Sequence, residues 1–315
     1  MKKRWSNKLI FATVALILML CTSVSANDKI RFASVSWTGV TVKTELAVNI
    51  LDSLGYKTTK RTLSVPIAYK ALEMGDADIF LGNWMPSMAT IANKFFDNGS
   101  VVKYVANMPG AKYTLAAPSY VVEAGLKDFS DIARYGDKLE HKIYGIEAGN
   151  DGNQIILDMI EKDKFGLGDF KLVETSEAIM VAEVKTLAQQ GKWVVFLGWA
   201  PHHMNTLIDM QYLTGSTAKT FGSNNGTATV YTNLRRGFAE EQPNVAKLLK
   251  NLIFPVPMMN EISRLLNANS GMKHAEAGLR WIKQHPEVYK PWFENVTTVD
   301  GKPALLVFEG YLQQQ

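Results

Sequence analysis

The stretch Lys29-Ile-Arg-Phe-Ala-Ser-Val-Ser-Trp37 decides the fold together with the segments that follow it. It is predicted to be a strand, and residues 41–54 continue with apolar side chains at helical spacing. A second strand is predicted over residues 56–63, a second helix over residues 64–75 and a third strand over residues 77–81. This β-α-β-α-β order predicts a parallel sheet with helices on both faces, and such sheets bind ligands at the carboxyl ends of their strands.

The second half of the chain repeats part of this layout. Residues 69–86, YKALEMGDADIFLGNWMP, and residues 184–201, VKTLAQQGKWVVFLGWAP, each combine a helix end, a glycine, an apolar strand and an exit with tryptophan and proline. Residues 142–146 and 228–232 are further predicted strands, the latter returning to the first half. The repeat predicts an α/β fold with two lobes, each a mostly parallel sheet flanked by helices.

The composition is that of a globular protein without affinity for nucleic acid. Of the 315 residues, 47% are hydrophobic and 20% are charged, which excludes low complexity, collagen and intrinsic disorder. Four basic residues among the first eight positions account for the net charge of +4, because the rest of the chain carries 30 basic and 30 acidic residues. No basic field remains to attract phosphates.

The N-terminus has the pattern of an export signal. A basic start precedes an apolar run over residues 9–21, and Val24 and Ala26 place small side chains before a cleavage site. We predict a signal peptide over residues 1–26 and a periplasmic mature protein. A lipid anchor on Cys21 is the alternative, but the preceding residue is a leucine, where a small residue is expected. Without Cys21 the mature chain has no thiol and no disulfide.

No pattern of catalytic residues stands out. The sequence has no G-x-S-x-G motif and no phosphate loop with a trailing lysine. The pair His202-His203 is a weak metal candidate, because neighbours in sequence rarely bind one metal, and packing of His202 beside Trp199 is favoured. The glycine-rich loop 149–153 either receives an anion on its backbone N–H groups or caps the next helix through Asn150 or Asp151. We therefore predict no catalytic residue, no metal and no cofactor.

Aromatic residues at strand ends are more informative. Trp37, Trp84 and Trp199 lie among Gly, Asn, Thr and Pro rather than inside apolar runs, and Tyr113 follows a predicted turn over residues 108–110. Core packing is one interpretation of these rings. The other is an aromatic box for a quaternary ammonium, which has no N–H to donate and is attracted to the faces of aromatic rings.

Six segments together make the sequence recognisable. It resembles the periplasmic choline-binding proteins of ABC importers, within the wider family of choline, glycine betaine and carnitine binders. The resemblance spans nearly the whole mature chain and is carried by Trp37-Thr38, Ser64-Val-Pro66, Phe80-Leu-Gly-Asn-Trp-Met-Pro86, Gly110-Ala-Lys-Tyr-Thr-Leu115, Tyr144-Gly-Ile-Glu-Ala-Gly-Asn-Asp-Gly-Asn153 and Phe196-Leu-Gly-Trp-Ala-Pro-His202.

The resemblance implies a two-lobed "Venus flytrap" of the periplasmic-binding-protein type. Lobe 1 is expected to comprise residues 27–110 and 224–315, and lobe 2 residues 111–223. The expected role is capture of a quaternary-ammonium solute between the lobes and its delivery to an ABC permease and its ATPase at the inner membrane. The protein is expected to act as a monomer and not as an enzyme.

The resemblance also assigns a binding site. The cage of three tryptophans and one tyrosine corresponds to Trp37, Trp84, Tyr113 and Trp199. Asn150 matches the polar residue that reaches the far end of choline in the family, and its amide suits a hydroxyl or a carboxylate. The adjacent Asp151 is a further candidate.

Two departures from the family pattern leave the ligand open. Choline binders of the family typically carry Asp directly after the Trp-Thr pair, where this chain has Gly39, and often Glu after the second-lobe tryptophan, where it has Ala200. Both changes remove negative charge, which weakens attraction for choline and relieves repulsion of a carboxylate on glycine betaine or carnitine. Gly39 is therefore a candidate site residue.

Two other functions remain compatible with the sequence. The first is a periplasmic sensor subunit that presents the same ligands to a receptor. The second is an enzyme acting on methylated amines, which the absence of a cysteine, metal cluster or nucleophile motif disfavours.

Overall fold

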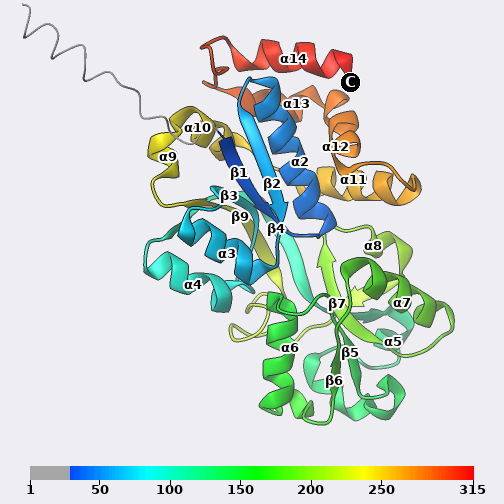
Figure 1. Cartoon of the computed structure of the whole chain (residues 1–315). Coiled ribbons are helices and arrows are strands. Elements are labelled where there is room, and N and C mark those ends of the chain that lie inside the picture. The colour runs from blue at the N-terminus through cyan, green and yellow to red at the C-terminus, as the bar shows by residue number, and fades with distance from the viewer. Residues whose placement is uncertain (1–28) are drawn as a thin grey trace, which may run out of the picture.

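The computed structural model describes residues 29–315, so the predicted signal peptide lies outside the described residues. One mixed sheet runs through the molecule in the order β2-β1-β3-β9-β4-β7-β5-β6, with β8 paired to β4 (Figure 1). The strands are Lys29–Ser34 (β1), Lys57–Thr62 (β2), Ile79–Met85 (β3), Val101–Pro118 (β4), Lys142–Tyr144 (β5), Lys171–Val173 (β6), Val195–Ala200 (β7), Met210–Tyr212 (β8) and Thr227–Arg235 (β9).

Helices cover both ends of this sheet (Figure 1). Around β1, β2 and β3 lie Thr38–Ser53 (α2), Val65–Met74 (α3), Ala89–Asp97 (α4), Phe238–Glu241 (α9), Pro243–Asn251 (α10), Val256–Ala268 (α11), His274–Lys283 (α12), Pro286–Tyr289 (α13) and Ala304–Gln314 (α14). Around β5, β6 and β7 lie Ser119–Glu123 (α5), Asp151–Glu161 (α6), Glu177–Gln189 (α7) and Met204–Leu207 (α8). The expected two-lobed α/β architecture is confirmed.

The N-terminal elements form the predicted parallel unit. β1 pairs in parallel with β2 on one side and with β3 on the other. Helix α2 buries its apolar face, including Leu46 and Ile50, against the sheet and the C-terminal helices. A Cβ at Gly278 in α12 would lie 2.8 Å from the Leu46 side chain, so the glycine lets α12 approach α2 closely. This packing fixes the start of α2, next to the site.

The sequence repeat is a structural repeat as well. The unit α3–β3 ends at Pro86, and the unit α7–β7 ends at Pro201, each after a cis peptide bond. β7 pairs in parallel with β5, and β5 with β6, as a second α/β unit requires. The two exits carry Trp84 and Trp199. The repeat therefore presents one tryptophan from each lobe.

Two antiparallel strands join the halves. β4 pairs with β9 along its first part and with β7 and β8 along its second part, and β9 pairs antiparallel with β3. The predicted turn at residues 108–110 is wrong, because these residues form an irregularity inside β4, where the register with β9 shifts and Gly110 has a φ of +77°. A bulge bends a strand without ending it. The predicted lobe boundary at residues 110 and 111 falls at this bulge.

Within residues 29–315 no helix is both long enough and apolar enough to cross a lipid bilayer.

Candidate functional site: an aromatic pocket between the lobes

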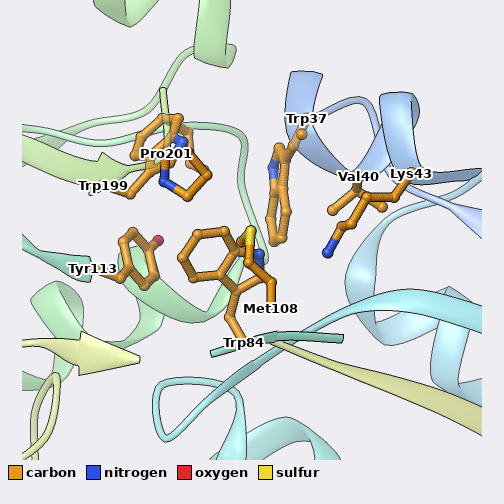
Figure 2. Close-up of a pocket in the computed structure, with 10 residues that line it drawn as sticks. Trp37, Val40, Lys43, Trp84, Met108, Tyr113, Trp199 and Pro201 are labelled. Atoms are coloured by element: carbon orange, nitrogen blue, oxygen red, sulfur yellow. The ribbon is translucent and has the colours of Figure 1, made fainter. Parts of the chain in front are cut away.

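A pocket lies where the two units meet, with about 480 Å³ of empty space, part of it open to solvent (Figure 2). Both units contribute to its walls. The lining residues are Trp37, Gly39, Val40, Lys43, Trp84, Met108, Tyr113, Ile146, Trp199 and Pro201.

The four expected aromatic residues come together here from four different elements. Trp37 precedes the first turn of α2, and Trp84 lies near the end of β3. Tyr113 lies in β4 directly opposite Trp199 of β7. Three of the four therefore owe their positions to strands of one sheet, and Trp37 to the loop between β1 and α2.

The rings are arranged edge to face and not stacked on one another. The ring centroids of Trp84 and Tyr113 are 5.9 Å apart at an angle of 60°, and those of Tyr113 and Trp199 are 6.2 Å apart at 83°. All four residues lie in the pocket wall and are at most 8% exposed. Ring faces that are not covered by another ring, in a space shielded from water, suit a cation without N–H groups.

A carboxylate orients Trp37. Its indole Nε1 donates to Glu147 Oε1 at 2.6 Å, across from the first unit to the second. Burial raises the pKa of Glu147 above its usual range, while the hydrogen bond from Trp37 partly opposes this shift. The contact therefore ties the position of the Trp37 ring to the relative placement of the lobes.

A second acid lies behind Tyr113. Asp151 is fully buried, and burial raises the pKa of its carboxyl to about 6. Neither oxygen of the Asp151 carboxyl group has a hydrogen-bond partner among residues 29–315. The hydroxyl of the nearby Ser87 donates to the Trp84 carbonyl at 3.1 Å instead. Burial and the neighbouring Asp151 charge both raise the pKa of the Tyr113 phenol, which therefore remains neutral. At neutral pH the ionised Asp151 makes the potential around the Tyr113 ring more negative.

The other two candidates occupy different positions. Gly39 lines the pocket from the first turn of α2. Asn150 is the N-cap of α6: its Oδ1 accepts from the Asn153 N–H at 2.9 Å, and its Nδ2 donates to the Glu147 carbonyl. Asn150 is not among the residues that line the pocket. Its amide is thus engaged in the capping role that the local sequence also allowed.

His202 packs beside Trp199, with ring centroids 4.9 Å apart, as favoured from the sequence. Its Nε2 lies 3.1 Å from Glu177 Oε1, and Glu177 also accepts from the Thr38 N–H at 3.2 Å and from the Thr38 hydroxyl. Burial raises the pKa of Glu177, but the bonds from His202 and Thr38 outweigh it and hold the pKa below its usual range. No cluster of three metal-ligating side chains occurs among the described residues.

Sequence reasoning missed Lys43. This residue lies in the second turn of α2, is 1% exposed and lines the pocket. Nζ donates to Asn107 Oδ1 at 3.0 Å, and burial lowers the pKa of the amine to about 7. A helix position four residues after Gly39 faces the same side, so helical spacing places Lys43 on the face of Gly39, although it does not show that this face is buried.

Most of the chain matches a known protein family. Residues 28–284 match the OpuAC family, the substrate-binding domain of ABC-type glycine betaine transport systems. The chain belongs to this family. It is a family of transport proteins and not of enzymes.

Solved structures agree in fold and in sequence. An ABC-transporter choline-binding protein in complex with choline is 45% identical, with a TM-score of 0.87, and the match covers 90% of this chain and 98% of that one. An unliganded, semi-closed structure of an ABC-transporter choline-binding protein, also 45% identical over the same shares, has a TM-score of 0.81.

A curated relative extends the comparison. The glycine betaine/carnitine transport binding protein GbuC of Listeria monocytogenes is 28% identical over 175 residues, which are 55% of this chain and 56% of that protein.

Proposed function

We propose that this protein binds a trimethylammonium solute among Trp37, Trp84, Tyr113 and Trp199 and delivers it to an ABC permease and its ATPase. The observation that carries the proposal is that these four rings, from both lobes, line one pocket. Ring quadrupoles attract a methylated ammonium in a space shielded from water. The choline and glycine betaine named for the OpuAC relatives support this ligand class.

The two acids beside the rings support the same proposal. Glu147 and Asp151 lie around the Trp37 and Tyr113 rings and add negative potential to the cage. We infer that they attract the cation through the rings and not by direct contact, because neither is a lining residue. Asn150 would then act by holding the start of α6, which carries Asp151.

We further propose that the protein works in the periplasm as a monomer, after loss of residues 1–26. Lobe 1 would comprise residues 27–110 and 224–315, and lobe 2 residues 111–223. The position of the predicted boundary at the β4 bulge supports this division, since bending there would change the angle between the lobes.

Calorimetric titration of the purified protein with choline, glycine betaine, carnitine and tetramethylammonium tests the ligand class. We expect saturable binding of at least one trimethylammonium compound, with proline and glycine as controls that lack the methylated cation of the cage ligands. If none of the four methylated compounds binds while the protein is folded, the proposed function is wrong.

A further inference from the structure

Lys43 is an unexplained charge in a site for a cation. The residue is almost fully buried in α2, and its amine lines the same pocket as the four rings. Of its three N–H groups, one donates to Asn107 Oδ1 at 3.0 Å. The amine also lies 5.9 Å from the centre of the Phe254 ring. It forms no ion pair with a carboxylate of residues 29–315, so within the described chain its charge is not neutralised.

A second donor of the pocket has no acceptor within the described chain. The indole Nε1 of Trp84 is buried and has no hydrogen-bond partner among residues 29–315. In Figure 2 the six-membered ring of Trp84 extends toward Tyr113, while its nitrogen lies on the side nearer Lys43. Buried donors normally have acceptors, because leaving one unpaired costs free energy. An unpaired indole N–H and an amine whose charge is not neutralised, both at one pocket, indicate that the ligand brings an acceptor.

The charges of the pocket are separated. The Lys43 amine reaches into the pocket from α2, on the side of Trp37 away from Trp199 and Tyr113 (Figure 2). The acids lie on the other side: Glu147 accepts from Trp37, and Asp151 lies behind Tyr113. One end of the pocket is therefore negative and aromatic, and the other end is positive with N–H donors.

The glycine before Lys43 leaves its charge accessible. Gly39 lies one helical turn earlier on the same face, and a Cβ there would meet nothing closer than the Met259 methyl at 3.9 Å. No side chain of residue 39 therefore stands between the amine and the pocket. A ligand group can approach Lys43 from this side.

We propose that Lys43 Nζ, with Trp84 Nε1, binds the carboxylate of a zwitterionic trimethylammonium ligand whose cationic end lies among the rings. The pocket thereby selects betaines over choline. The inference rests on the proposed function and adds a specificity-determining residue to it. Choline carries a hydroxyl in place of the carboxylate, so it leaves the Lys43 charge uncompensated and is repelled by it.

The test is calorimetric titration at pH 6.5 of three proteins with glycine betaine, carnitine and choline. The proteins are the parent, Lys43→Met and Lys112→Met. Methionine keeps the length of the lysine and removes the charge. Lys112 is the matched control: it is a half-buried lysine beside the Tyr212 ring, next to Tyr113 in sequence but outside the pocket lining.

We expect the parent to bind at least one of the two zwitterions more tightly than choline. Lys43→Met should weaken the binding of that zwitterion about tenfold to a hundredfold, because a charge-assisted hydrogen bond is lost. The affinity for choline should stay unchanged or increase. Lys112→Met should change neither affinity. Thermal melting of each variant verifies that it is folded.

Three outcomes would overturn the inference. If Lys43→Met leaves the ratio of zwitterion to choline affinity unchanged, Lys43 has no part in selectivity, although binding of either ligand still supports the proposed function. If Lys43→Met weakens all ligands equally, Lys43 supports the pocket structurally. If the parent binds neither zwitterions nor choline, the proposed function fails and this inference with it.

Discussion

Individual rings set the affinity of the proposed cage, and they differ in how they are held. Trp37 has its N–H bonded to Glu147, whereas the N–H of Trp84 has no partner in the described chain. Trp199 is backed by the His202 ring. Truncating Trp199 removes a ring face without removing a donor–acceptor pair of the protein, so Trp199 gives the cleanest test. Truncating Trp84 removes a ring face together with the N–H that is proposed to bind a ligand carboxylate.

Trp84→Ala and Trp199→Ala should each weaken binding of the preferred trimethylammonium ligand by roughly 1–3 kcal/mol. Phenylalanine at either position should retain part of the affinity, because it keeps a ring face. Titration calorimetry measures the effect, and circular dichroism checks the fold. If the two rings only pack the core and do not contact the ligand, the folded variants should melt at a lower temperature and bind with unchanged affinity. That result in both alanine variants would exclude the cage.

Gly39 is the second decisive residue. Its φ is not positive, it lies in the first turn of α2, and there is room for a Cβ, so a side chain at this position is tolerated. An aspartate there would lie one turn before Lys43, at the spacing of helical ion pairs. It would also add negative charge beside the cage.

Gly39→Asp should therefore shift selectivity toward choline. We expect choline to gain about fivefold and a zwitterion to lose at least as much, because the new carboxylate attracts the cation and pairs with Lys43. Gly39→Asn is the control, with nearly the same shape and no charge. Equal zwitterion-to-choline ratios in the Asp variant, the Asn variant and the parent would show that charge at this position does not reach the ligand.

At the scale of elements, α2 combines stability and binding in one helix. One face packs against the sheet and α12, while its first turns carry Gly39, Val40 and Lys43 into the pocket. A buried amine there is unfavourable for the fold when charged. Its pKa of about 7 in the folded chain, against 10.5 for an ordinary lysine, means that the unfolded chain binds more protons between these values.

The ligand-free protein should thus become more stable as the pH rises from 7 toward 10.5, as far as Lys43 contributes. Below pH 7 the full cost of the buried charge is present, and Lys43→Met should raise the free energy of unfolding there by a few kcal/mol. Urea unfolding of parent and variant at pH 6.5 and 9.5 measures the difference. A variant that is less stable than the parent at both pH values would show that the bond to Asn107 matters more than the desolvated charge.

The same titration predicts pH-dependent selectivity. The carboxylate of a zwitterionic ligand binds better beside a charged Lys43 amine, and choline binds better beside a neutral one. The ratio of zwitterion to choline affinity should therefore fall as the pH rises above 7. The groups packed around Lys43, Asn107 of β4 and the Phe254 ring, do not titrate. Glu147 and Asp151 at the other end of the pocket have raised pKa values. They lose their negative charge by protonation at low pH, which weakens the binding of every cationic ligand. Lys43→Met should remove the fall in the ratio above pH 7 and keep the loss at low pH.

At the scale of the whole molecule, bonds across the pocket link closure to the site. Glu177 of the second lobe accepts from the backbone N–H and hydroxyl of Thr38, adjacent to the cage residue Trp37. Glu147 holds the Trp37 ring itself, and the His203 N–H donates to Ser263 Oγ of α11 at 2.9 Å. These contacts join the two lobes across the pocket, so a closed arrangement of the lobes is needed to make them.

Thr38→Val should weaken ligand binding mainly through faster dissociation. Valine keeps the shape of the side chain and removes the hydroxyl that donates to Glu177. We expect a loss of affinity of about tenfold, which corresponds to one buried hydrogen bond to a charged group. Thr41→Val is the matched control, because its hydroxyl bonds to the Trp37 carbonyl at 3.0 Å within the same helix start. Stopped-flow tryptophan fluorescence separates the rates. A dissociation rate equal in the two variants would contradict the role of this contact in closure.

The sequence alone determined the order of the first elements and the aromatic set. Apolar periodicity and glycine stops located α2, α3 and β1–β3, because these patterns are local. The repeat ending at Trp84 and Trp199 predicted one tryptophan from each lobe for the same reason. The turn at residues 108–110 was wrong, since a bulged strand and a turn share the same proline and glycine, and only pairing with β9 and β7 shows that β4 continues.

Tertiary structure decided which residues share the pocket and what charge they bring to it. Lys43 looks in sequence like any solvated helix lysine, because nothing local reveals that α2 is covered on that face by β4 and the loop before α11. The resemblance matched Asn150 to a ligand-facing amide, and this role stays a prediction; the fold shows that its hydrogen bonds to Glu147 and Asn153 are made within its own loop. Burial, and with it the pKa of Lys43 and Asp151, depends on residues far apart in the chain, so only the folded molecule could assign the charge pattern of this site.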